Sequence, residues 1–374
     1  MEDRKRIINQ VSSGLGNSLH IGTFFGIPVK IHWTFGLLLL FIAYTILNSD
    51  LKPWQSVAYG LVILTMFFCV VLHEFGHALT GKRFGVKTMD ILVSPIGGLA
   101  RMNKMPEKPI HEFFVAIAGP LVNLAIAIMI SLLFLIITGK FSFDINTYDF
   151  NNPWEFVRVL ALINFTLFLF NLIPAFPMDG GRILRSLLAT KIGKVKATKI
   201  ASLIGRFLAV CFIIYGIFDE QIILAMIGLF IFMMAGQEYD QTKIQALLSN
   251  TKVGDIMRTN FTKLHLSDTY TIVLEKYYRS GEQNFLVYDS MGNLSGSVPE
   301  LFIKDTIKNN TQDKTVNEFM SSKTLKVHSD QMLRYTVDAM RQEGVAIVAV
   351  EKDDDIIGVL DRNAIENFLR LKSE

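Results

Sequence analysis

The segment His73-Glu74-Phe75-Gly76-His77 holds the side chains whose types and spacing are best suited to chemistry. Histidines four residues apart project from one face of a helix, where both can bind the same metal ion. Glu74 is next to them and is placed to take a proton from a metal-bound water. The segment lies within the apolar run 57–79, and ionisable side chains inside a membrane are costly and usually functional. The pattern is typical of a zinc protease, here predicted to lie within a membrane.

A catalytic zinc site normally has three protein ligands and a water, so the two histidines leave one ligand to be found. The apolar segment 154–173 is followed by two prolines, which stop a helix, and then by Asp179 before two glycines. In the topology predicted below, this segment and the segment with the histidines both cross the membrane from the outside to the inside. Asp179 is therefore expected at the depth of the histidines and is a candidate third ligand. The alternative is a turn or helix cap at the membrane interface.

The composition indicates a membrane protein. The chain has 374 residues, of which 51% are hydrophobic, and most of the apolar excess precedes residue 240. Cys69 and Cys211 both lie in apolar runs, which predicts no disulfide framework. The net charge of +3 is small for this length and argues against nucleic acid as a partner. No cleavable signal peptide is evident in the first 20 residues.

Six apolar segments are long enough, or nearly so, to be transmembrane helices. The segment 219–221 separates the last two, which predicts a tight hairpin; the alternative is one long broken span. The loops on one side carry sixteen Lys and Arg residues, against Lys52 and Lys140 on the other. The basic side is cytoplasmic by the positive-inside rule, so both termini are expected in the cytoplasm and the protein in the plasma membrane. The predicted spans are 33–48, 57–79, 113–138, 154–173, 201–218 and 221–238.

Several motifs together resemble one family. Asn171-x-x-Pro174 and Asp179-Gly180 lie about 100 residues after the histidine motif, and Gly119-Pro120-Leu121-Val122-Asn123 and Pro95-Ile96-Gly97-Gly98 lie between. Over roughly residues 20–240 the chain thus resembles the site-2 protease family, the intramembrane zinc metalloproteases of peptidase family M50.

This resemblance implies a site and a substrate class. It implies that His73, His77 and Asp179 bind one Zn²⁺ and that Glu74 is the general base. The substrates it implies are transmembrane or membrane-associated proteins, cleaved within or near the lipid bilayer.

Two further polar side chains and one loop are candidates for handling the substrate. Asn123 and Asn171 are expected either to orient substrate or share the oxyanion charge, or to form hydrogen bonds between helices or cap helix ends. The segment 86–102 alternates as strand, turn and strand, which predicts a small membrane-associated β-sheet. An exposed edge there, near Ile91–Val93, is expected to pair with an extended substrate.

The histidine segment also has structural alternatives. His73 and His77 could be hydrogen-bonded polar residues that pack helices together. Cys69 lies one helical turn before His73 and is either a further metal ligand or a small apolar residue.

Residues 246–374 form a second, soluble region with a weak internal repeat of about 63 residues. The units, about 246–308 and 309–374, each alternate helix-period and strand-period segments. They resemble a tandem pair of CBS domains, an α/β module that often binds adenosine nucleotides. The hydroxyl and final carboxylate of the nucleotide motif are missing after Gly296 and after Gly358. A dimerising or substrate-gating role is therefore favoured over binding of an adenosine nucleotide.

The predicted fold is a polytopic α-helical membrane protein with six transmembrane helices and a small β-sheet in residues 1–245. It is followed by a cytoplasmic α/β CBS-domain pair in residues 246–374. The predicted function is that of an intramembrane zinc metalloendopeptidase whose CBS pair provides regulation or a homodimer contact. One alternative is a catalytically silent membrane adaptor of the same fold. Another is a transporter that uses the polar groups for an ion, although no repeated halves with broken helices are evident.

Overall fold

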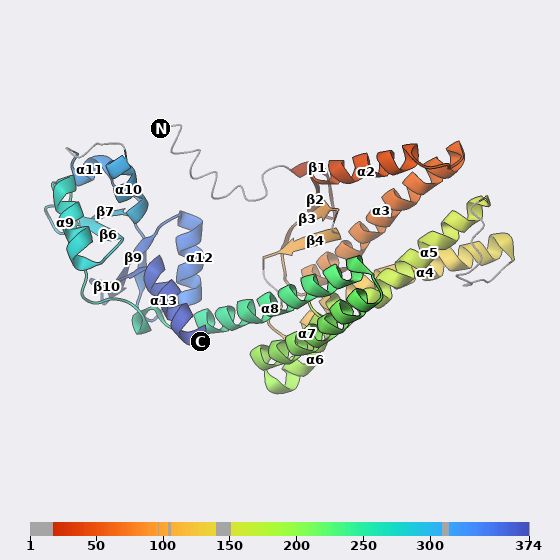
Figure 1. Cartoon of the computed structure of the whole chain (residues 1–374). Helices are drawn as coiled ribbons and strands as arrows, with labels where there is room; N and C mark the ends of the chain where they lie inside the picture. Colours follow the sequence, from red (N-terminus) through yellow and green to blue (C-terminus); the bar gives the residue numbers. More distant parts are fainter. Residues whose placement is uncertain (1–17, 96, 104–105, 140–150, 309–313, 374) are drawn as a thin grey trace. The chain divides into compact units, whose positions relative to one another are not determined.

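The computed structural model describes residues 18–95, 97–103, 106–139, 151–308 and 314–373 (Figure 1). The chain divides into two compact units, Met1–Tyr239 and Asp240–Glu374, and each is described by itself. One residue of the 95–98 motif and several basic residues used for the predicted orientation lie outside the described residues: Ile96, Arg4, Lys5, Arg6, Lys104 and Lys140.

The first unit is built mainly from helices. They are α2 (Phe35–Leu47), α3 (Pro53–Arg83), α4 (Pro109–Thr138), α5 (Pro153–Asn171), α6 (Asp179–Ile192), α7 (Lys194–Phe218) and α8 (Ile222–Asn250). Proline is the first residue of α3, α4 and α5, where its missing N–H costs no hydrogen bond. Among the described residues, five helices are long and apolar enough to cross a membrane, namely α3, α4, α5, α7 and α8. The protein is therefore a multi-pass membrane protein.

The prediction of six transmembrane helices is wrong by one. Helix α2 has only 13 residues between Thr34 and Asn48, so it is about 20 Å long against about 30 Å of hydrocarbon. The chain nevertheless returns to its starting side after α3, because β2 (Ile27–His32) pairs in parallel with β3 (Thr88–Ser94). The segment before α2 and the segment after α3 thus lie in one sheet.

This sheet has four strands in the order β1-β2-β3-β4 and packs against α3. Its outer strands are β1 (Ser18–Phe24) and β4 (Gly97–Met102), each antiparallel to its neighbour. Ile91 of β3 is fully buried, in a cluster with Phe75 and Ala78 of α3. The expected strand, turn and strand are present, but β3 is an inner strand. The prediction of a free edge at Ile91–Val93 is therefore wrong, and among the described residues the edge strands are β1 and β4.

Helices α7 and α8 form the predicted tight hairpin. Asp219–Gln221 connects them, with Glu220 in the left-handed region at a φ of 55°. Ser202 Oγ of α7 donates to the carbonyl oxygen of Ala235 of α8 at 2.6 Å, far along both helices from the connection. The two helices are therefore antiparallel neighbours, and the alternative of one broken span is wrong.

The second unit contains two copies of one topology. Its elements are η1 (Val253–Asp255), β5 (Lys263–His265), α9 (Tyr270–Ser280), β6 (Phe285–Tyr288), β7 (Leu294–Val298), α10 (Glu300–Lys308), α11 (Val316–Phe319), β8 (Lys326–His328), α12 (Leu333–Glu343), β9 (Ile347–Lys352), β10 (Asp355–Asp361) and α13 (Arg362–Ser373). In each sheet the first two strands are parallel and the third is antiparallel. The start of each copy bridges to the last strand of the other, Arg258 to Val359 and Ser321 to Ser297. The two repeats therefore form one body.

Candidate metal centre

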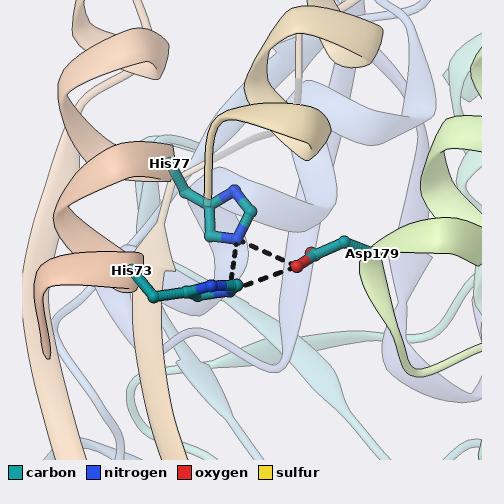
Figure 2. A group of neighbouring side chains, drawn as sticks. All are labelled: His73, His77 and Asp179. Atoms are coloured by element: carbon teal, nitrogen blue, oxygen red, sulfur yellow. Dashed lines mark hydrogen bonds and ion pairs between the residues drawn. The ribbon is translucent and has the colours of Figure 1, made fainter. Parts of the chain in front are cut away.

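His73, His77 and Asp179 converge on one point inside the first unit (Figure 2). The histidines lie one turn apart on α3, with their ring planes at 81° to each other, and Asp179 is the first residue of α6. The two Nε2 atoms are 3.0 Å apart, and each is 3.2 Å from Oδ2 of Asp179. All three residues are buried. Three donor atoms from two helices thus form a nearly equilateral triangle.

The triangle has about the size that a zinc ion requires. Ligand atoms about 2.0–2.1 Å from Zn²⁺ at tetrahedral angles lie about 3.3 Å from one another. The donor atoms here are 3.0–3.2 Å apart, and imidazole nitrogen and carboxylate oxygen are both zinc donors. Three protein ligands leave the fourth tetrahedral position open, as in a catalytic zinc site.

A backbone carbonyl sets the tautomer of His77. The Nδ1–H of His77 donates to the carbonyl oxygen of Val115 on α4 at 2.7 Å. In the neutral ring its Nε2 then carries a lone pair, which faces the other two donor atoms. Nδ1 of His73 is buried and has no hydrogen-bond partner within the described part of the chain. Only one of the two histidines is thus oriented by a second hydrogen bond from its ring.

Gly119 of α4 leaves room where the donor atoms meet. A Cβ at this position would overlap Nε2 of His77 and lie 2.7 Å from Nε2 of His73. Glycine inside a helix costs about 1 kcal/mol relative to alanine, so its presence in α4 has a steric reason. The space beside the two Nε2 atoms exists because residue 119 has no side chain.

The connection between α5 and α6 brings Asp179 to the histidines. A Cβ at Gly180 would overlap the carbonyl oxygen of Leu172, and one at Gly181 would lie 2.8 Å from the carbonyl carbon of Ala175. The two glycines let the first turn of α6 pack directly on the connecting backbone. Asp179 is held at the start of α6, where a carboxylate is favoured by the helix dipole.

Glu74 contacts the sheet. Its Oε2 accepts a hydrogen bond from the backbone N–H of Ala100 in β4 at 2.7 Å. A Cβ at Gly98 of the same strand would lie 2.7 Å from Cγ of Glu74. The carboxylate therefore lies directly against the outer edge of β4, and one of its two oxygens is fixed there.

The two predicted asparagines differ in their surroundings. Asn123 lies one turn beyond Gly119 on α4 and is buried, and its Oδ1 has no partner among the described residues. Nδ2 of Asn171 donates to the carbonyl oxygen of Leu167 in its own helix at 3.0 Å. Neither asparagine is hydrogen-bonded to the donor triangle in the part of the chain that the structure describes.

Sequence reasoning missed several polar groups of the first unit. Val115 and Ala100 act through backbone atoms, which no side-chain pattern reveals. Asn164 of α5 is fully buried, and its Oδ1 has no partner among the residues described. Its only signal in the sequence is a polar residue inside an apolar span. Cys69 is buried, and the cluster of possible metal ligands in the described residues does not include it.

Long apolar helices around a buried His₂Asp cluster define the class of protein as a membrane protein with a candidate metal site. Residues 61–212 match the family model of Peptidase family M50, and residues 316–370 match that of the CBS domain. The chain is 41% identical to "Zinc metalloprotease MJ0392" of Methanocaldococcus jannaschii over 244 residues, 65% of this chain and 67% of that protein. The chain belongs to peptidase family M50, the site-2 proteases, and carries a tandem CBS pair.

Two further comparisons cover different shares of the chain. The "Putative zinc metalloprotease sll0528" of Synechocystis is 25% identical over 379 residues, 95% of this chain and 96% of that protein. A solved structure of a site-2 protease from Methanocaldococcus jannaschii is 40% identical, covers 60% of this chain and 95% of that one, and has a TM-score of 0.42.

Proposed function

We propose that this chain is an intramembrane zinc metalloendopeptidase, which hydrolyses peptide bonds of transmembrane or membrane-associated proteins. The triangle of His73, His77 and Asp179 carries the proposal, because its donor atoms lie within 3.2 Å of one another and are buried among membrane helices. These residues are the proposed ligands of one Zn²⁺. The name of the 41% identical relative, a zinc metalloprotease, supports the choice of metal.

Glu74 is the proposed general base. Bound zinc would polarise the scissile carbonyl and lower the pKa of a water to about 7. Glu74 would take the proton from the attacking water and pass it to the leaving amine. The hydrogen bond from Ala100 supports this role, because it fixes the carboxylate plane through Oε2 and leaves the second oxygen for the proton.

Asn123 is the better supported of the two substrate-orienting candidates. Its buried Oδ1 is unpaired within the described residues and can accept a hydrogen bond from a substrate N–H. Nδ2 of Asn171 is already used inside its own helix. We therefore assign substrate orientation to Asn123 and a helix-end role to Asn171.

The outer edge of β4 is the proposed docking strand for an unwound substrate. In an antiparallel pair, alternate residues direct their N–H and C=O groups to the outer edge. Ala100 does so toward Glu74, and by this alternation Gly98 presents its own groups on the same edge. A substrate strand added there would lie beside the proposed general base.

Disulfide crosslinking tests this docking strand. Leu99 of β4 and Ile21 of β1 are 54% and 53% exposed and lie on the two opposite outer strands. Leu99→Cys should crosslink to cysteines near the cleavage site of a co-expressed single-span substrate, and Ile21→Cys should not. Equal crosslinking from both strands would remove the support for β4.

The substitution Glu74→Gln tests the proposed function itself. It should keep zinc bound and abolish cleavage of a co-expressed single-span substrate, whereas Glu220→Gln in the exposed α7–α8 connection should cleave normally. Unchanged cleavage by Glu74→Gln would refute the enzyme mechanism. A wild-type chain that binds zinc but cleaves no membrane substrate would instead favour the catalytically silent adaptor.

We further propose an orientation and a division of labour. The basic loops support cytoplasmic termini in a plasma membrane, with the metal centre opening toward the cytoplasm. We assign proteolysis to residues 1–245 and regulation, through homodimerisation or substrate gating, to residues 246–374. Cysteine labelling of Met291, which is 87% exposed, from the cytoplasmic side alone is the expected result for the Met291→Cys variant.

The CBS pair is proposed to act without an adenosine nucleotide. A cleft in the second unit is lined by Glu282 and Asp361, both buried carboxylates, and by Arg258. Arg258 pairs with Asp361 at 3.1 Å, so its charge is not free for a phosphate. Ala364 stands where the nucleotide motif has its ribose-binding carboxylate. Calorimetric titration of the full chain with ATP and AMP should give no binding, and micromolar affinity would contradict this proposal.

A further inference from the structure

Arg185 is a buried cation in the middle of the first unit. It lies on α6, and its side chain is only 2% exposed. Its Nε donates to Oε1 of Glu112 on α4 at 2.7 Å, and its Nη1 donates to Oε1 of Glu238 on α8. The ring of Phe176 lies beneath the guanidinium, 5.1 Å away. By sequence, Arg185 is one of the basic residues of a cytoplasmic loop, but its charge is enclosed between three helices.

The charges around Arg185 are balanced. Lys194 lies 4.0 Å from the second oxygen of Glu112, so two cations face two carboxylates. Glu112 is nearly as buried as Arg185, while Glu238 is 30% exposed. A buried ion pair usually adds little net stability, because desolvation offsets the attraction, and its best attested effect is to fix one arrangement of its neighbours.

The ion pair joins the helix of Asp179 to the helix that orients His77. Glu112 and Val115 are three residues apart on α4, so they lie on the same face about one turn apart. Val115 holds His77 of α3 through its carbonyl oxygen, and Glu112 holds Arg185 of α6. Arg185 follows Asp179 by six residues in one continuous helix. One short stretch of α4 thus sets the positions of two helices that carry metal-ligand candidates.

We propose that Arg185 is a positioning residue of the metal centre. Its ion pair with Glu112 fixes the placement of α6 along α4 and thereby holds Asp179 at 3.2 Å from both histidines. The inference rests on the proposed function, since it gives Asp179 its role as a metal ligand. Metal–ligand distances tolerate only about 0.2 Å, so a small slip of α6 is enough to weaken the site.

Titration of the full-length protein with Co²⁺ tests this role. The d–d absorption of Co²⁺ reports both its affinity and its coordination geometry without any need for activity. Arg185→Gln should bind Co²⁺ about 10- to 100-fold more weakly, the range typical of lost outer-shell partners, with an altered absorption band. Lys191→Gln is the matched control, because it removes one positive charge from an exposed position on the same helix. It should bind Co²⁺ within about twofold of wild type.

A second variant separates positioning from folding. Arg185→Gln leaves Glu112 buried without its main partner, which can unfold the protein. The double variant Arg185→Met with Glu112→Leu removes both buried charges, and its folding is checked by thermal unfolding without metal. Weakened Co²⁺ binding at an unchanged unfolding temperature supports the inference, and wild-type affinity in the double variant overturns it. If the wild-type chain takes up no Co²⁺, or takes it up without His73 and His77, the proposed function fails first.

Discussion

The substitution Gly119→Ala should remove metal from the protein without removing a ligand. The added Cβ would overlap Nε2 of His77 and lie 2.7 Å from Nε2 of His73, whereas non-bonded atoms prefer a separation of about 3.5 Å. The ring of His73 must move by about 0.8 Å and the ring of His77 must move further, at least four times the tolerance of about 0.2 Å for metal ligands. We expect the affinity for zinc to fall at least about 100-fold, which corresponds to about 2.8 kcal/mol of binding free energy.

The assay is the zinc content of the purified full-length protein after equilibration with a series of chelator concentrations. Gly60→Ala on α3 is the matched control, because the nearest atom to its added Cβ is 4.0 Å away. Alanine is the better helix former, so Gly60→Ala should keep its zinc and lose no stability. If Gly119→Ala holds zinc as tightly as wild type, the space beside the two Nε2 atoms is not where the metal binds.

Three other changes test separate parts of the molecule. Ala100→Pro removes the N–H that anchors Glu74, at a strand edge that tolerates proline. The cleavage rate should fall about 10- to 100-fold with unchanged zinc content. An unchanged rate would mean that the anchor is not needed. The hydrogen bond from Arg101 holds the pKa of Asp90 in β3 below its usual range, so the stability it contributes is present above about pH 4 and is lost as the pH falls through the lowered value. Wild type should therefore be more stable than Asp90→Asn at pH 7, with the gap closing in acid, and parallel unfolding curves at every pH would contradict this. Removal of metal by a chelator should abolish cleavage and lower the unfolding temperature, and added Zn²⁺ should restore both. An unfolding temperature that does not change with zinc would contradict a native metal site.

The positions of the long apolar helices could be predicted because hydropathy and proline act locally. The same signals do not reveal the polar helix α6, nor that α7 begins at Lys194 and α8 continues to Asn250. The apolar runs, the two prolines after span 154–173 and the position of Asp179 before two glycines all carry short-range signals. The same signals overestimate the first span, since a run of 16 apolar residues does not show that its helix stops at Leu47. Length near the spanning limit is where hydropathy is least informative.

The strand order and the supports of the metal centre could not be predicted, because they depend on contacts between distant backbone atoms. Strands β1 and β2 contain a bulge between His20 and Gly22, which breaks the alternation that marks a strand. The placement of β3 as an inner strand requires its parallel partner about 60 residues earlier. The anchor of Glu74 is a peptide N–H, and the partner of Arg185 lies 73 residues away on another helix. No local pattern encodes these pairings.

The parallel pairing of β2 with β3 also dictates an order of events during synthesis. The α2–α3 hairpin separates the two strands in the chain, so the centre of the sheet can close only after α3, the helix of the histidines, has been made. His77 and Asp179 are 102 residues apart, which a ribosome takes about 5–20 s to translate. A nascent chain therefore contains His73, Glu74 and His77 well before the third ligand candidate, Asp179, has been made. If Asp179 is the third zinc ligand, as proposed, the growing chain can cleave no peptide bond until α6 has been made.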